Sequence, residues 1–173
     1  MKILTRVWAA STLLVGAVAQ ADTPSSVPLA TALEAAQAAV AACKANGYNV
    51  TVTVMDMDLT TRLVLRADGA PERTVEIGRR KAYTVIKTGM SSGDFGKTVP
   101  PPPRPATPPA PGSAPPMPGP VNGDPNLITW AGGLPITAGG KTIGAISASG
   151  APGGDKDEAC VSAGLAKIGG GAK

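Results

Sequence analysis

The C-terminal third of the chain contains the pattern that most restricts the possible folds. Two runs of alternating apolar residues, 134–137 and 142–149, flank residues 138–141, which include a glycine pair. Alternation with a period of two indicates half-buried β-strands, and glycines between two such runs are typical of a tight hairpin turn. Asp155 with Glu158 three residues later is typical of a helix start, with Asp155 as the capping side chain. The stretch therefore predicts a hairpin followed by a helix.

A second hairpin and two more helices are predicted upstream. Thr31 followed by Glu34 has the form of a capping box, which starts a helix rich in small apolar residues. Three valines alternate with two threonines and a methionine over 50–55 before Asp56, and apolar residues alternate again over 63–65 after a polar turn. This pattern is typical of two half-buried strands. Residues 71–89 start with proline and carry an apolar stripe beside many basic residues, which predicts another helix.

A proline-rich segment, residues 100–125, separates these elements from the C-terminal hairpin. It contains Pro, Ala, Gly and Ser with almost no large apolar side chain. Such a composition cannot form a packed core and favours extended polyproline geometry. Residues 126–131 then include Leu, Ile and Trp and are interpreted as a short strand that re-enters the fold. We expect the segment to be a long loop inside one domain, either inert or acting as a lid or a tether.

The order of these elements indicates the fold class. It reads helix, strand, strand, helix, loop, short strand, strand, strand, helix. Strands joined by hairpins pair in antiparallel fashion, and helices between them must pack on the faces of the same sheet. The sequence thus predicts an α/β fold with one antiparallel sheet of about five strands and helices packed on it.

Residues 1–21 have the form of a secretory signal peptide. Two basic residues precede an apolar run over 7–18 that is too short to span a bilayer, and small residues at 19 and 21 match a cleavage site. We therefore expect export to a bacterial periplasm or beyond, with a single domain over 22–173 and no membrane span after cleavage. Cleavage would remove two of the 16 basic residues and none of the 12 acidic ones, so the net charge of the mature chain is 14 − 12, or +2. This low charge and the lack of a dense basic stripe in the sequence argue against a nucleic-acid partner.

The chain contains no histidine. This absence removes the usual general base, the commonest metal ligand and the usual axial ligand of haem. The acidic residues fall at predicted turns and helix starts, and the glycine pairs match no phosphate-binding loop. We therefore predict no catalytic residue and no metal site. An enzymatic role is the less favoured possibility, and it would require a substrate or cofactor that brings its own reactivity.

Several segments of the chain together resemble the GlcG/HbpS family, whose members are often labelled haem-binding or haem-degrading. The segments that carry the resemblance are residues 50–56, 68–70 (DGA), 80–84 (RKAYT), 132–136 (GGLPI), 144–160 (GAISASGAPGGDKDEAC) and 163–165 (AGL). The resemblance implies a profilin-like α/β sandwich with a roughly five-stranded antiparallel sheet, assembled into homo-oligomers, with haem as a candidate cofactor. Family members often carry a histidine in the first hairpin turn, where this chain has Asp58, and usually have a shorter connection before the GGLPI segment.

Candidate ligand-binding residues come from the basic helix and from this resemblance. Arginines and a lysine could hold an anionic group such as a carboxylate or a haem propionate, although a solvated basic helix face is the commoner explanation. The glycine pair allows close approach of backbone, and further side chains lie where the resemblance places the edge of the binding region. The candidates are Arg66, Arg80, Lys81, Tyr83, Thr84, Met90, Gly132 and Gly133.

The two cysteines, Cys43 and Cys160, form a candidate disulfide. An oxidising compartment favours a bridge between the first and the last helix. Alternatively, Cys43 is a buried free thiol that packs as a small hydrophobic residue. The sequence leaves both alternatives open.

Two classes of function compete on this basis. The first is an exported binding protein that holds haem or another anionic small molecule at a helix–sheet edge. The second is a homo-oligomeric interaction protein with no ligand of its own.

Overall fold

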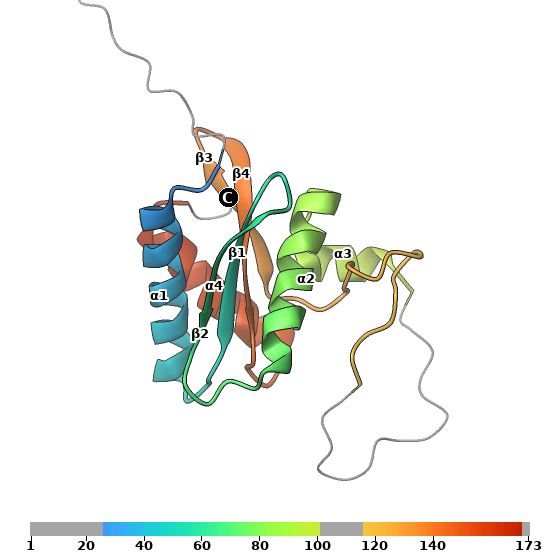
Figure 1. Cartoon of the computed structure of the whole chain (residues 1–173), viewed down its shortest axis with the longest axis horizontal. Coiled ribbons are helices and arrows are strands. Elements are labelled where there is room, and N and C mark those ends of the chain that lie inside the picture. The colour runs from blue at the N-terminus through green and yellow to red at the C-terminus, as the bar shows by residue number, and fades with distance from the viewer. Residues whose placement is uncertain (1–25, 101–115, 171–173) are drawn as a thin grey trace, which may run out of the picture.

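The computed structural model describes residues 26–100 and 116–170 (Figure 1). The predicted signal peptide and residues 101–115 of the proline-rich segment lie outside this part of the chain. No helix in the two described segments combines the length and the apolar character needed to cross a membrane. The elements, in chain order, are α1 (Leu29–Ala45), β1 (Thr51–Asp56), β2 (Thr61–Arg66), α2 (Arg73–Thr88), α3 (Ser92–Thr98), β3 (Gly133–Ala138), β4 (Lys141–Ser149) and α4 (Gly154–Lys167).

The strands form one antiparallel sheet in the order β2-β1-β4-β3. Both predicted hairpins are confirmed, because β1 pairs with β2 and β3 pairs with β4. The two hairpins join through β1 and β4, where Thr51 lies opposite Ser149. The α/β class and the antiparallel sheet are confirmed, whereas the described residues contain four strands instead of about five. Residues 126–131 form no strand, because the N–H of Ile128 donates to the hydroxyl of Thr84 in α2 at 3.0 Å.

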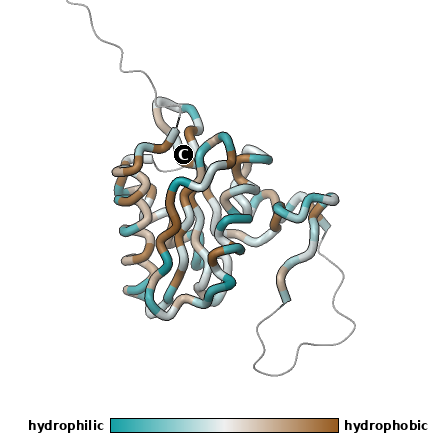
Figure 2. Tube along the Cα trace, in the orientation of Figure 1, coloured by the Kyte–Doolittle hydropathy of each residue, from teal (hydrophilic) through white to brown (hydrophobic). Residues whose placement is uncertain are grey.

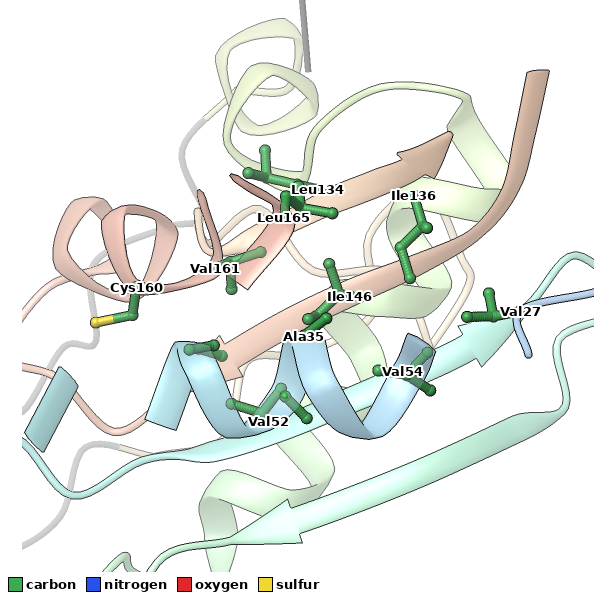
Figure 3. Close-up of a cluster of buried hydrophobic side chains, with 14 of the residues drawn as sticks. Val27, Ala35, Val52, Val54, Leu134, Ile136, Ile146, Cys160, Val161 and Leu165 are labelled. Atoms are coloured by element: carbon green, nitrogen blue, oxygen red, sulfur yellow. The ribbon is translucent and has the colours of Figure 1, made fainter. Parts of the chain in front are cut away.

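Helices cover both faces of the sheet, which gives three layers (Figure 1). α1 and α4 pack side by side on one face, and α2 with the short α3 lies on the other. On the α1 side, valines of β1 pack against alanines of α1 and apolar residues of β4 and α4 (Figure 3). Val52, Val54 and Ile146 are fully buried there, and each such side chain contributes about 1.5–3 kcal/mol. Figure 2 shows hydrophobic residues concentrated in the strands at the centre of the fold.

The capping box predicted at Thr31 is wrong. α1 already begins at Leu29, and the N–H of Ala32 donates to the carbonyl of Pro28 at 2.9 Å, so Thr31 lies inside the first turn. Within the described residues, no side chain caps this helix. Pro28, with φ −58° and ψ 139°, occupies the cap position, three residues before the cap that the hydroxyl pattern indicated.

A disulfide joins α1 to α4 through Cys43 and Cys160, whose Cα atoms lie 5.3 Å apart. Of the two alternatives that the sequence left open, the structure therefore contains the bridge. It closes a separation of 117 residues, and both cysteines are buried. The disulfide covalently links α1 and α4, the two helices that form one outer layer of the fold.

Candidate functional site

A cavity of about 500 Å³ lies where α2 meets the loop between β4 and α4. Arg73, Thr74, Ile77 and Lys81 line it from α2. Trp130 adds an aromatic side chain to the wall. The end of β4, the loop after it and the start of α4 contribute Ser149, Gly150, Ala151, Gly153, Gly154 and Asp157. Its volume falls within the range of small-molecule sites. Three elements that are distant in sequence therefore surround one candidate ligand space.

A buried ion pair lies at the wall of this cavity. The ammonium of Lys81 contacts Oδ2 of Asp157 at 2.7 Å, and the two side chains are 2% and 4% exposed. Lys81 also donates to the carbonyl of Ala148 at 2.8 Å, while Oδ1 of Asp157 accepts from the N–H of Ala151 at 2.9 Å. The pair thus ties α2 and α4 to the end of β4 and to the loop that lines the cavity.

Burial shifts the pKa values of both partners toward their neutral forms. Desolvation lowers the pKa of Lys81 and raises the pKa of Asp157. The attraction between the two charges, with their mutual hydrogen bond, opposes both shifts. Each charge therefore depends on its partner, because an isolated buried ion is strongly disfavoured.

The glycine pair at the start of β3 provides the space that the ion pair needs. Gly132 has φ +115°, and a Cβ there would lie 2.8 Å from Nζ of Lys81 and 2.7 Å from Cβ of Asp157. A Cβ on Gly133 would lie 2.8 Å from the carbonyl oxygen of Lys81. The structure therefore brings the predicted candidates Lys81, Gly132 and Gly133 together. The groups that approach the two glycines include residues of α2 and α4 of the protein itself.

The balance of charge in the cavity is positive. Arg73 and Lys81 each contribute one positive charge and Asp157 one negative charge, so the ionisable lining sums to 2 − 1, or +1. The Arg73 side chain is half-buried and its guanidinium lies 3.9 Å from the sulfur of Met117. No carboxylate among the described residues forms a salt bridge with it. This guanidinium is the cation of the cavity that remains available to an anionic ligand.

The start of α4 differs from the sequence prediction. α4 begins at Gly154 with Gly153 at its cap, so Asp155 lies within the first turn and caps nothing. The prediction of Asp155 as the capping residue is wrong, because the N–H of Asp157 already bonds to the carbonyl of Gly153. Gly153, Gly154 and Asp157 at this helix start are part of the cavity lining.

Three other predicted candidates hold a segment of the chain against α2. The guanidinium of Arg80 donates to the carbonyls of Pro118 at 2.7 Å, Gly119 at 3.1 Å and Leu127 at 2.6 Å. Tyr83 donates to the carboxylate of Asp124 at 3.0 Å, and Thr84 accepts from the N–H of Ile128. We call residues 116–130 the strap. The sequence predicted that residues 100–125 form a loop without a packed core, either inert or acting as a lid or a tether. The structure shows that residues 116–125 are hydrogen-bonded to α2, because their backbone carbonyls and the Asp124 carboxylate accept from Arg80 and Tyr83.

The remaining candidates lie away from the cavity. Arg66, at the end of β2, donates from Nε to the carbonyl of Ala70 at 2.8 Å. Met90 follows α2 and is 36% exposed. Neither residue lines the cavity. The predicted residues thus form a group at Lys81 and the glycine pair, a second group at the strap, and two separate positions.

Sequence reasoning did not select three residues that the structure places at the cavity, namely Asp157, Arg73 and Trp130. Asp157 was grouped with helix-start acids, and Arg73 with a solvated basic face. The signal that could have found Asp157 is the buried stripe of α4, since Asp157, Cys160, Val161 and Gly164 recur at helical spacing.

A second hollow of about 470 Å³ lies between the end of α1 and α4, beside the disulfide. Tyr48 and Lys156 line it, and the ammonium of Lys156 lies 5.6 Å from the centroid of the Tyr48 ring. Its remaining lining consists of alanines, Asn46 and Cys160. Within the described residues, no group of three Cys, Asp or Glu side chains could hold a metal ion.

Comparison with known proteins identifies relatives of this fold. A family model described as "Haem degrading protein HbpS-like" matches residues 27–166. The crystal structure of HbpS is 30% identical and covers 90% of this chain and 97% of its own length, with a TM-score of 0.66. A double mutant of Streptomyces reticuli HbpS is 28% identical, with 91% and 96% covered and a TM-score of 0.64. A PduOC:haem complex is 19% identical, with 82% and 94% covered and a TM-score of 0.65. Among curated protein sequences, none matches significantly.

Proposed function

The chain belongs to the HbpS-like family, and from this premise we propose that it is an exported binding protein for a small anionic ligand. The ligand occupies the cavity between α2 and the β4–α4 loop. The observation that carries this proposal is the net positive lining of that cavity, with the guanidinium of Arg73 free of any carboxylate partner in the described chain. Export rests on the signal-peptide pattern of residues 1–21.

A carboxylate is the anionic group that this lining suits. A guanidinium binds a carboxylate through charge-assisted hydrogen bonds, which are roughly twice as strong as neutral ones. The Lys81–Asp157 pair keeps the loop 149–154 in place through the Ala148 carbonyl and the Ala151 N–H. Ile77 and Trp130 add apolar surface beside these polar groups. Convergent polar groups in a mostly apolar cavity are the usual composition of a ligand site.

Haem is a candidate for this ligand, since the family name refers to haem and a structural neighbour is a complex with haem. The residues fit its propionates better than its iron. Both cysteines are joined in the disulfide, so neither offers a thiolate to iron. The hydroxyl of Tyr83 is hydrogen-bonded to Asp124. Lys81, the lining residue with a nitrogen suited to iron, is bonded to Asp157 and to the Ala148 carbonyl. Haem bound here would therefore be held by its carboxylates and its ring, without a side chain from this cavity on the iron.

The experiment that tests the proposal measures carboxylate affinity by isothermal titration of the mature protein. Benzoate and haemin serve as probes, at low and high salt. Arg73→Gln is expected to weaken binding by at least about tenfold, the loss of one charge-assisted hydrogen bond. Arg66→Gln is the matched control, since Arg66 lies outside the cavity and its loss removes the same charge. Equal weakening by both variants, or no binding by the wild type, would contradict the proposal.

Assembly into a homo-oligomer is a second proposal, supported by exposed apolar side chains at the start of α1. Leu29 is 60% exposed and Leu33 is 40% exposed on the same helix. Apolar side chains exposed together often mark contact surfaces. Light scattering on the mature protein is expected to give a mass above that of one chain, and Leu29→Ser with Leu33→Ser is expected to lower it. A monomeric wild type would contradict this second proposal.

A further inference from the structure

We propose that this cavity selects a planar aromatic carboxylate, with Trp130 as the ring-recognising side chain and Arg80 and Thr84 as the residues that position it. The inference rests on the proposed function, because it assigns a ligand class to the same cavity. It goes further in giving a role to the strap. The juxtaposition that carries it is the indole of Trp130, which the strap supplies, and the Arg73 guanidinium, which the strap contacts through Met117 and which has no carboxylate partner among the described residues.

Trp130 is placed as a ligand contact would be. It lines the cavity, yet 37% of its surface remains exposed. Ile77, the other large apolar side chain of the lining, is 4% exposed and already packed into the fold. An indole with uncovered surface at a cavity provides a flat face for a ring, and aromatic pairs gain about 0.5–1.5 kcal/mol beyond their buried area.

The backbone around Trp130 is fixed on α2. Arg80 donates to the carbonyl of Leu127 at 2.6 Å, and the N–H of Ile128 donates to Oγ1 of Thr84 at 3.0 Å. The side chains of Arg80 and Thr84 are buried, as are Leu127 and Ile128 themselves. The two residues that precede Thr129 and Trp130 are therefore anchored by bonds shielded from solvent.

The backbone after Trp130 is fixed by close approach of a second helix. A Cβ on Gly154 would lie 2.7 Å from the carbonyl oxygen of Ala131 and 3.0 Å from its nitrogen. On the α3 side, a Cβ on Gly96 would clash with the carbonyl of Thr129. Glycines on two helices thus let the chain pass closely on both sides of Trp130. A side chain carried on so constrained a backbone is preorganised, which lowers the entropy cost of binding.

The strap also contacts the cation of the cavity. Met117, near the start of the strap, lies with its sulfur 3.9 Å from the Arg73 guanidinium. The same segment therefore borders the charged group at one point and supplies the aromatic ring at another. A ligand that satisfies both must carry a carboxylate and a flat apolar body, which is the chemistry of an aromatic acid.

Two probes separate aromatic recognition from general hydrophobic binding. Benzoate and cyclohexanecarboxylate carry the same acid group on six-membered rings, but only benzoate is planar and aromatic. The wild-type mature protein is expected to bind benzoate about two- to tenfold more tightly, the range that an aromatic pair contributes. Trp130 is the only tryptophan in residues 22–173, so its fluorescence reports directly on ligand at this wall.

Variants test the selecting and positioning roles. Trp130→Leu is expected to reduce the affinity ratio to about one while retaining cyclohexanecarboxylate binding, and Trp130→Phe is expected to keep part of the preference. Thr84→Val removes the acceptor for Ile128 and is expected to lower the ratio and to increase acrylamide quenching of Trp130. Thr84→Ser, which keeps the hydroxyl, is expected to restore both. Thermal unfolding of each variant shows whether the fold is retained.

The outcomes distinguish this inference from the proposed function. Equal affinity for the two acids, both sensitive to Arg73→Gln, would overturn aromatic selection and leave the anion site standing. Binding of neither acid would overturn both. A Thr84→Val variant that folds and keeps the wild-type ratio and quenching would remove the positioning role while leaving Trp130 as the contact.

Discussion

Replacing Asp157 by asparagine is expected to destabilise the fold by about 3–5 kcal/mol, the usual cost of removing one partner from a buried ion pair. Asparagine keeps an oxygen that can accept from the N–H of Ala151, so the substitution removes the negative charge and the acceptor of Lys81 while retaining the bond to the loop. Lys81 is then left 1% exposed with the carbonyl of Ala148 as its remaining acceptor.

The size of this effect follows from the proton that Lys81 can release. An amine with an ordinary pKa of about 10.4 needs about 1.36 × 3.4, or about 4.6 kcal/mol, to become neutral at pH 7. Burial already lowers the pKa of Lys81, and loss of the carboxylate lowers it further. Because Lys81 can release its proton, the destabilisation by Asp157→Asn is limited to about 4.6 kcal/mol. This limit agrees with the loss of about 3–5 kcal/mol expected when one partner of a buried ion pair is removed.

The sign of the pH dependence is a specific test of this explanation. With the folded pKa of Lys81 below its unfolded value, the unfolded variant binds more protons at neutral pH, so stability rises with pH. The defect of Asp157→Asn is expected to shrink between pH 7 and pH 10, by up to about 1.36 kcal/mol per unit. Urea unfolding followed by circular dichroism measures the free energy of unfolding at each pH. With a dependence of this free energy on urea of about 2 kcal/mol/M, a loss of about 4 kcal/mol lowers the urea midpoint by about 2 M.

The matched control is the exposed pair formed by Lys97 and Asp94, whose side chains are 79% and 57% exposed. Lys97→Met is expected to cost less than about 1 kcal/mol, as surface pairs do. A cost for Asp157→Asn as small as that of the control, or a defect that does not shrink toward pH 10, would refute the account of the buried pair.

Three further predictions concern the disulfide, haem and the strap. Reduction of the Cys43–Cys160 bridge is expected to lower stability by about 4–5 kcal/mol on the chain-entropy model for its 117-residue separation, and thiol counting on unreduced protein should find none free. Haemin is expected to bind weakly without a low-spin spectrum, because the chain has no histidine; a sharp low-spin Soret spectrum would contradict this. Deleting residues 101–115 is expected to change the thermal midpoint little, since loop length adds closure entropy only slowly. Extending the deletion to Gly119 should lower the midpoint, because it removes two carbonyl acceptors of the buried Arg80.

The elements that sequence reasoning predicted well are those with a local signal. Both hairpins were predicted because alternation with a period of two is visible within a few residues, and glycines mark the turn at 139–140. Helix starts were less accurate: Pro28 and Gly153 set the observed caps, whereas the predicted caps relied on Thr31 and Asp155. Short polar side chains near a helix start favour a cap without fixing which residue provides it.

The candidate site could be predicted only in part, because its contacts join distant residues. Lys81 and Gly132 were selected from the sequence, but Asp157 lies 76 positions from Lys81 and nothing local to either residue indicates the pairing. The strap was missed for a related reason. Its bonds to Arg80 use backbone carbonyls, and every residue has a carbonyl, so composition alone cannot reveal that 116–128 is anchored.

The most direct test of the central claim locates an anionic ligand on the protein. Two-dimensional ¹H–¹⁵N NMR of the mature chain during a benzoate titration reports on the N–H groups around the cavity. The account predicts that the largest saturable shifts occur at Gly150, Gly153, Gly154 and the indole N–H of Trp130, and that Arg73→Gln weakens them. Shifts centred on Tyr48 and Lys156 in the second hollow, or no saturable shift at any concentration, would contradict it.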